Sequence, residues 1–519
     1  MKKFIAPMLI GATLATAAMA ADDSLRAEIE ALKAQMAELK EAQSKVNYDA
    51  LKRQLLEVKS HDAGDNIKFS VDFRTAYDIV DYKTSTAAGV KGSTSNGVWT
   101  NKLILNMAAQ PTDNLVFKGA LAAYKYFGNN STSAYNGFQN MDWYTTQSPG
   151  DGSIYLREAY FLYFGDMGEV PYTVSFGRRP STDGFMTNLR EDNEHAASPV
   201  GHNINMEFDG ASFRFNLENV TGLSGFYAKL CLGRGNSDAD GKYPGFTGFN
   251  GSNLTMAGMM SLALPYTKSN YDSPNMDLAG LLLQLYDDGQ YKVMANYFQG
   301  WNMMGANFTR TSDGGTIGDP TDDTWGMNLT DVGDLTGGTL SVQINGIGDE
   351  INDFLDDSIF FASFAYSKTD PKGTHNIFNP ADPAGVTAVT EMLGSPKSET
   401  GTSYYVGFNV PGFMDDDRIG VEYNHGSKYW RSFTYGEDTL VGSKLSTRGD
   451  AYELYYNIPL VGDYLTAQLR YTYISYDYTG SDMFFGSTGT PLTKEEAAAQ
   501  GMGFVDSASN IRLSMRYRY

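Results

Sequence analysis

The densest group of charged side chains lies in one segment, from Ser175 to His202. It places arginines close in sequence to carboxylates; the charged candidates are Arg178, Arg179, Arg190, Glu191, Asp192 and Glu194. Charges of both signs on one loop can set a field across a narrow, water-filled passage and select ions there. The alternative is a solvated surface loop held by its own ion pairs.

The same segment contains residue types that could form a catalytic triad. Ser198 lies near His195 and His202, with Asp192 or Glu191 available to orient a histidine. A triad is recognised by its three-dimensional geometry, so proximity within one loop is weak support. The chain also lacks a GxSxG nucleophile elbow. We therefore predict that the protein is not an enzyme.

Metal and cofactor sites have little support in the sequence. His195, His202 and Glu194 could approach one another, but their spacing on a loop fixes no coordination geometry. The single cysteine, Cys231, excludes an intramolecular disulfide, a CxxCH haem attachment and a cysteine-based iron–sulfur site. We predict no metal and no cofactor.

Alternating strands are the elements that would position the charged loop. The last nine residues, Ile511 to Tyr519, alternate between apolar and polar, as do residues 67–78. Successive side chains of a strand point to opposite faces, so Leu513 and Met515 share one face while Arg512 and Arg516 share the other. One face suits lipid and the other suits water, which is typical of an outer-membrane β-barrel.

The spacing of turns and loops predicts the number of strands. Seven short turns are expected at Pro111 to Asn114, Gly165 to Pro171, Glu218 to Leu223, Asp287 to Gln290, Ile347 to Asp357, Pro411 to Asp417, and Pro459 to Asp463. Long polar segments centre near residues 90, 140, 190, 250, 315, 385, 440 and 495. Together they predict an all-β, transmembrane, antiparallel barrel of about 16 strands over residues 65–519, with 14 or 18 as alternatives.

Residues 180–203 form the third external loop in this arrangement. The third loop of general porins folds into the barrel and narrows it, so this segment is the candidate constriction. Three local features are also expected: a bulge at Asp209-Gly210, a capping box that begins at Thr493, and a helix from Val386 to Leu393. Residues 325–329 fit either a strand or a loop.

The water-facing side chains of the predicted strands are rich in bases. They are Lys68, Arg74, Lys102, Lys118, Lys229, Lys292, Arg418, Arg470, Arg512 and Arg516. The acids on the same faces are few, chiefly Asp72, Glu422 and Glu453. An unpaired basic lumen would favour anions. Alternatively, the bases pair with acids of an infolded loop and leave a nearly neutral pore.

The N-terminal residues carry two further predictions. Residues 1–20 have the charged start, apolar run and small-residue site of a secretory signal peptide. Residues 21–60 contain no proline or glycine, and Leu25, Ile29, Leu32, Met36 and Leu39 follow a heptad spacing. We predict a periplasmic coiled coil and a homotrimer; a solvated linker helix is the alternative. The net charge of −21 argues against a nucleic-acid partner.

Four short motifs in the middle of the chain carry a family resemblance. They are Tyr155 to Tyr160, Val174 to Pro180, Asp183-Gly184 and Asn188 to Glu191. With the predicted coiled coil and the terminal aromatic residue, they resemble a family of exported, porin-like proteins of unknown function from Gram-negative bacteria. The resemblance implies an outer-membrane channel and supplies no substrate.

These observations predict an outer-membrane porin for passive diffusion of small hydrophilic solutes or ions, in contact with membrane lipid. An anion preference depends on the basic lumen. Two alternatives are a structural anchor that tethers the outer membrane and a barrel that sheathes an electron-transfer partner. A lumen filled by large side chains or a buried loop would favour the anchor.

Overall fold

The computed structural model describes residues 67–519, apart from the gaps that follow. These gaps are residues 87, 128–145, 151, 194, 241–248, 251–252, 255–266, 269–273, 313–323, 349–350, 379–385, 390–392, 415 and 482–489. The chain divides into two units, residues 1–57 and 58–519, and the described residues belong to the second. The predicted signal peptide and coiled coil lie outside the described residues.

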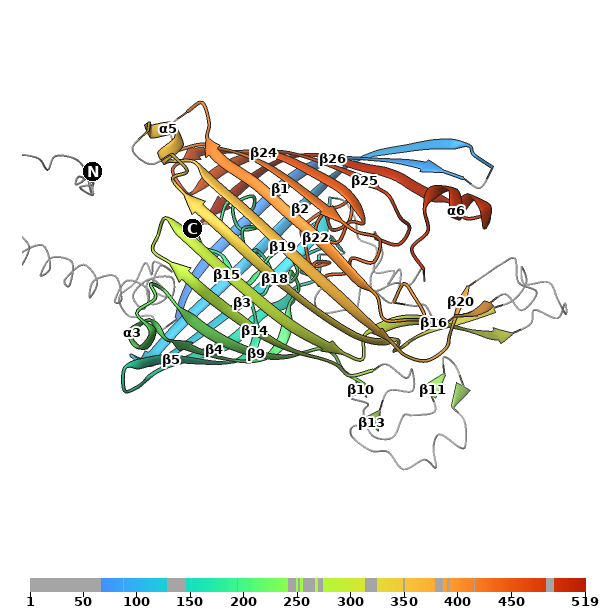
Figure 1. The fold of residues 1–519 in the computed structure, drawn as a ribbon, viewed down its shortest axis with the longest axis horizontal. Helices are drawn as coiled ribbons and strands as arrows, with labels where there is room; N and C mark the ends of the chain where they lie inside the picture. The colour runs from blue at the N-terminus through green and yellow to red at the C-terminus, as the bar shows by residue number, and fades with distance from the viewer. Residues whose placement is uncertain are drawn as a thin grey trace, which may run out of the picture. The chain divides into compact units, whose positions relative to one another are not determined.

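Within the described residues, sixteen strands form one closed barrel (Figure 1). They are β1 (Ile67–Ser85), β2 (Lys91–Thr112), β3 (Leu115–Tyr126), β4 (Tyr155–Met167), β5 (Val170–Arg179), β8 (Phe208–Asn216), β9 (Tyr227–Asn236), β14 (Met276–Asp287), β15 (Tyr291–Trp301), β18 (Gly333–Asn345), β19 (Ile359–Pro371), β22 (Thr400–Pro411), β23 (Arg418–Gly426), β24 (Gly449–Val461), β25 (Leu465–Tyr476) and β26 (Phe504–Arg518). Each pairs antiparallel with its chain neighbours, and β1 closes the ring on β26 with Arg74 opposite Arg516. The predicted barrel of about 16 strands is confirmed.

All seven predicted short turns connect barrel strands. Two of them contain a helical turn, α3 (Glu218–Thr221) and α5 (Asp353–Asp356), and these lie at the same end of the barrel as the C-terminus (Figure 1). The long loops emerge at the other end, where β1 and β2 extend beyond most of the barrel strands and β1 stays paired with β26 as far as Ser85. The parity of strands therefore separates short and long connections onto opposite ends.

The long loops carry short secondary structure of their own. It comprises β6 (Gly184–Phe185), β7 (Ala197–Val200), β10 (Ala239–Asp240), β11 (Phe249–Asn250), β12 (Asn253–Leu254), β13 (Thr267–Lys268), β16 (Met304–Ser312), β17 (Thr324–Asp331), β20 (His375–Phe378), β21 (Val386–Val389) and α6 (Lys494–Ala499). The uncertain residues 325–329 lie in β17, which pairs with β16 in a separate hairpin. The capping box at Thr493 begins α6 as expected. The helix predicted from Val386 is wrong, because β21 forms there against β20.

The bulge predicted at Asp209-Gly210 is also wrong. Strand β8 begins at Phe208 and pairs with β5 and β9 without a shift in register. Ile204 and Met206, whose phase suggested the bulge, belong to the preceding loop and are not part of a barrel strand. The change of phase therefore marks the end of a loop.

The barrel is apolar outside and polar inside, as the alternation predicted. Leu513 and Leu340 point outward and are each 56% exposed, whereas Arg512 points inward and is 2% exposed. Among the described residues, no helix has the length and apolar content needed to cross a membrane.

Replacing Leu340 with arginine should destabilise the barrel, because Leu340 lies midway along β18 on its outer face. A charged side chain near the middle of a bilayer costs about 2–4 kcal/mol in such barrels. Urea unfolding in lipid vesicles measures the loss. Leu340→Met is the matched control and should cost less than about 1.5 kcal/mol; equal stability of the two variants would refute an outer lipid-facing position.

Candidate functional site

Two external loops fold into the barrel and pair with each other. We call residues 180–207 loop 3 and residues 427–448 loop 7. The backbone N–H of Asn205 donates to the backbone carbonyl of Phe433 at 2.6 Å, and the backbone N–H of Phe433 donates to the backbone carbonyl of Asn203 at 2.9 Å. The backbone N–H of Gly436 donates to the backbone carbonyl of Asn205 at 2.9 Å. These backbone bonds join the loops into one body inside the lumen.

Loop 3 and loop 7 pack against the barrel wall through apolar and polar side chains. Phe433 is fully buried and stacks edge-on against Phe298 of β15, with ring centroids 4.9 Å apart. The His202 ring nitrogens lie 2.8 Å from the Ser363 hydroxyl of β19 and 2.9 Å from the Ser403 hydroxyl of β22. Because both nitrogens are occupied, His202 is not positioned to activate Ser198.

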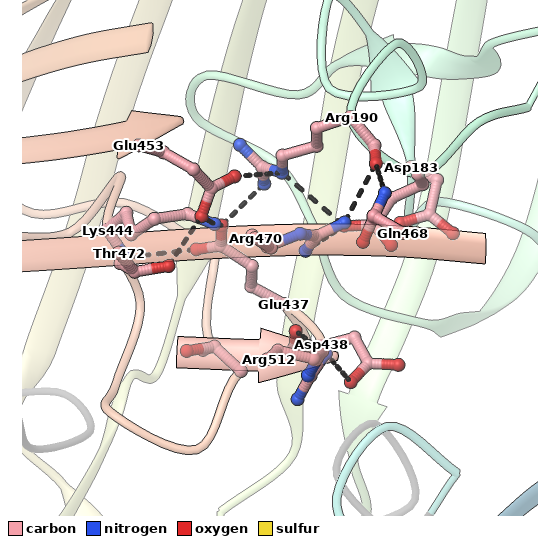
Figure 2. A network of polar contacts seen from close by, with 12 residues as sticks. Asp183, Arg190, Glu437, Asp438, Lys444, Glu453, Gln468, Arg470, Thr472 and Arg512 are labelled. Carbon is pink, nitrogen blue, oxygen red and sulfur yellow. Dashed lines mark hydrogen bonds and ion pairs between the residues drawn. The ribbon is translucent and has the colours of Figure 1, made fainter. Parts of the chain in front are cut away.

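Arg190 is the central cation of this body and is only 1% exposed (Figure 2). Its Nη2 donates to Glu437 of loop 7 at 2.5 Å, and its Nη1 donates to Glu422 of β23 at 3.0 Å. The Arg190 carbonyl accepts from Gln468 and Arg470 of β25 at 2.7 and 2.8 Å. Arg190 therefore links loop 3, loop 7 and two wall strands.

Asp438 of loop 7 gathers three bases from three wall strands. Its carboxylate lies 2.9 Å from Arg74 of β1, 2.8 Å from Lys102 of β2 and 3.2 Å from Arg512 of β26. The Tyr124 hydroxyl of β3 donates to it at 3.2 Å. Burial acts to raise the pKa of the Asp438 carboxyl, but the three cations hold it well below its usual value. Asp438 is therefore ionised, and its negative charge offsets part of the positive charge of Arg74, Lys102 and Arg512.

Other bases on the same side of the lumen also meet carboxylates. The ion pairs are Arg470 with Glu191 at 2.9 Å, Arg516 with Asp72 at 2.5 Å, Arg518 with Asp192 at 2.7 Å, Lys444 with Glu437 at 3.1 Å, and Lys444 with Glu453. This geometry agrees with the alternative in which infolded loops supply acids to the basic strands. On the wall formed by β24, β25, β26, β1 and β2, carboxylates pair with Arg74, Lys102, Arg470, Arg512 and Arg516.

Other predicted site residues lie apart from this network. Arg178 donates to the Arg157 carbonyl at 3.2 Å and pairs at 3.3 Å with Asp209, which is exposed at the rim. Arg179 and Lys118 are half-buried and face the lumen from β5 and β3. Glu194 lies outside the described residues. The structure thus brings together Arg190, Glu191 and the strand bases but leaves Arg178 at the edge.

Sequence reasoning missed the loop 7 residues Glu437, Asp438 and Lys444. A signal was present: loop 7 contains Trp430 and Phe433, which are at most 1% exposed, and large apolar residues are unusual in a solvated loop. The part of the chain that the structure describes holds no cluster of three or more histidine, cysteine, aspartate or glutamate residues suited to a metal ion.

Glu207 provides a pH-dependent contribution to loop stability. Burial raises the pKa of its carboxyl from 4.5 to about 7, although the positive charge of the nearby Arg157 acts to lower it. The Thr182 hydroxyl donates a hydrogen bond to the same carboxyl at 3.0 Å. The folded form holds its proton up to about pH 7 while the unfolded form ionises near 4.5. The contribution of Glu207 to the free energy of unfolding is therefore greatest below pH 4.5 and falls as the pH rises to about 7.

Glu207→Gln should remove that part of the pH dependence. The measurement is the melting temperature of purified protein from pH 4.5 to pH 8 for both chains, because their difference isolates Glu207 from the other carboxyls. The variant should gain stability relative to the parent as the pH rises. Parallel curves would show that the Glu207 carboxyl ionises equally in the folded and unfolded chains.

Several solved structures are similar to this chain. One is OprB of Pseudomonas putida, with 12% sequence identity and a TM-score of 0.43; the match covers 91% of this chain and 97% of that one. Another is an anion-selective porin from Comamonas acidovorans, with 12% sequence identity and a TM-score of 0.41; the match covers 87% of this chain and 100% of that one. A third is OmpF of Salmonella typhi, with 10% sequence identity and a TM-score of 0.41; the match covers 88% of this chain and 99% of that one. A search of curated proteins finds no match.

The family profile matches most of the chain, from residue 92 to residue 519, and includes the four central motifs and fourteen of the sixteen barrel strands in full. The chain therefore belongs to the family described as "Protein of unknown function (DUF3373)", whose resemblance the motifs predicted.

Proposed function

We propose that the protein is an outer-membrane channel through which small hydrophilic solutes or ions diffuse passively, with loops 3 and 7 as its constriction. One observation carries the proposal: a closed barrel with an apolar outer band has charged residues on its inner wall and two loops joined inside it. A charged wall is costly to build unless water meets it or opposite charges pair with it, and the loops supply part of that pairing here. The passage is therefore set by the space that the joined loops leave.

The charge pairing argues for weak ion selectivity at the centre of the constriction. Arg190, Asp438 and their partners compensate one another, so a passing ion meets little net charge there. An anion preference would have to come from the opposite wall, where Lys118, Arg179 and Lys229 face the lumen. The predicted homotrimer and periplasmic coiled coil remain predictions.

Conductance of the purified protein in planar lipid bilayers tests the proposal. A matched variant opens the constriction: Gly426 and Gly449 are paired residues of adjacent strands, so a short turn can replace residues 428–447. We expect small conductance steps from the parent and steps several-fold larger from this variant. A variant that folds, inserts and still conducts nothing would refute the channel.

A membrane anchor with a closed barrel is the second candidate, and the tight loop packing favours it. Arg190, His202, Trp430 and Phe433 are each at most 1% exposed inside the barrel. The same experiment separates the two functions. A silent parent together with a conducting loop 7 variant would identify a barrel that its own loops close.

A further inference from the structure

A small cavity lies between loop 3 and the inner wall of the barrel. Its volume is about 90 Å³, and residues of loop 3 and of β5, β8, β9, β14 and β15 line it. Leu232 faces outward and is 46% exposed, so its neighbours Cys231 and Gly233 face the lumen. In the strand ladders Gly233 is opposite Gly210, and Cys231 is opposite Gly280. Because three of these four residues are glycines, the wall recedes there and leaves the gap under loop 3.

The lining of the cavity is mainly apolar. Pro199 and Ile204 contribute from loop 3, and Leu278, Leu282 and Phe298 contribute from the wall. A water molecule in a cavity needs two to four polar partners, which carbon surfaces do not supply. An apolar group should therefore occupy this space more favourably than water does.

The uncharged polar side chains of the lining already have partners. The Ser198 hydroxyl accepts from the Lys229 Nζ at 2.6 Å, and the Ser181 hydroxyl donates to the Met206 carbonyl. The side-chain nitrogen of Asn296 donates to loop 3 at 2.8 Å. None of these three side chains depends on a ligand for its hydrogen bond.

Arg179 is the charged residue of the lining, and it lacks an acidic partner. Among the described residues, no carboxylate oxygen lies within 4.0 Å of its guanidinium group, and its buried Nε has no hydrogen-bond acceptor. The neighbouring Arg178, in contrast, pairs with Asp209 at 3.3 Å. A guanidinium group binds a carboxylate well, through two parallel hydrogen bonds. The cavity thus combines an apolar interior with one unpaired cation.

The volume of the cavity limits the length of a ligand. A cavity of about 150 Å³ binds benzene, so the smaller space here suits an alkyl chain of about three or four carbons. We propose that this cavity is a binding site for a short-chain carboxylate such as butyrate, with the alkyl chain in the cavity and the carboxylate on Arg179. The site names a solute class for the proposed channel, and it rests on that proposal for the passage of the acid but not for its binding.

Cys231 provides a direct measurement of binding, because it lines the cavity and is the sole cysteine of the chain. Butyrate should slow the modification of its thiol by methyl methanethiosulfonate in the purified full chain. Saturation-transfer NMR of butyrate measures the same binding without the thiol. The affinity should rise about fourfold for each added methylene from acetate to butyrate. It should stop rising beyond pentanoate, because the cavity is then full.

Gly280→Leu should abolish butyrate binding by filling the cavity. A Cβ added at Gly280 would lie 3.6 Å from its nearest heavy atom beyond the chain neighbours, so the new side chain can be accommodated. Ala295→Leu is the matched control. Ala295 is opposite the outward-facing Leu340, so this change adds bulk to the outer surface and should leave butyrate binding unchanged.

Arg179→Met should weaken butyrate binding about tenfold, because it removes a charged donor. Arg234→Met is its control, since Arg234 is exposed on the outer face of β9. Heat-modifiable migration on gels shows that each barrel is folded. Unchanged butyrate affinity in Gly280→Leu or in Arg179→Met would overturn the site, as would equal affinity for acetate and butyrate or an affinity that keeps rising to octanoate.

Binding and conductance separate this site from the proposed function. Butyrate binding by a barrel that conducts nothing would retain the site and refute the channel. A barrel that conducts but gives no butyrate signal by NMR would retain the channel and overturn the site.

Discussion

Arg190→Met is expected to raise single-channel conductance several-fold and to lower the free energy of unfolding by about 3–5 kcal/mol. Methionine keeps much of the length of the side chain but removes its charge. Glu437 and Glu422 would then be buried without the guanidinium that lies 2.5 and 3.0 Å from them. Leaving a buried charge uncompensated is costly, so loop 7 should separate from loop 3 and widen the constriction.

Planar-bilayer conductance and urea unfolding measure the two effects of Arg190→Met. Arg234→Met is the control, because Arg234 pairs with Asp277 at 2.7 Å where both side chains are more than 40% exposed. An exposed pair contributes at most about 1 kcal/mol, so this variant should keep parental conductance and nearly parental stability. If Arg190→Met folds and conducts as the parent does, the loops do not limit the passage.

Asp438→Asn is expected to shift ion selectivity toward anions by about fivefold. Asparagine keeps the shape of the side chain but leaves Arg74, Lys102 and Arg512 without their shared carboxylate. One unit charge a few ångströms from an ion in water contributes about 1 kcal/mol, which corresponds to about a fivefold ratio. The reversal potential in a potassium chloride gradient measures the change in relative permeability.

Asp209→Asn is the matched control for Asp438→Asn. Its carboxylate pairs with Arg178 at the rim and is 56% exposed, so water and salt screen the charge that is lost. The control should leave the reversal potential close to that of the parent. A shift of the same size in both variants would mean that selectivity depends on the total charge of the protein and not on the constriction.

The alternation of apolar residues at Ile204 and Met206 shows what a local sequence pattern cannot predict. Both residues continue the alternation of a strand, yet both belong to loop 3, and the Ile204 backbone forms an isolated bridge to Phe433 of loop 7. Apolar residues that pack inside a filled lumen have the same composition as those that face lipid. A period of two therefore identifies alternation but not the surface that the apolar side covers.

The sequence by itself determined the barrel: its alternation, turns and loops predicted about sixteen antiparallel strands with Leu513 outward and Arg512 inward. Alternation within a strand is a local property, so neighbouring residues suffice to read it. Only the tertiary structure decided which charges meet. Arg190 and Glu437 are 247 residues apart, and Arg74 and Asp438 are 364 apart. Such partners depend on how two loops fill a closed lumen, which no local pattern records.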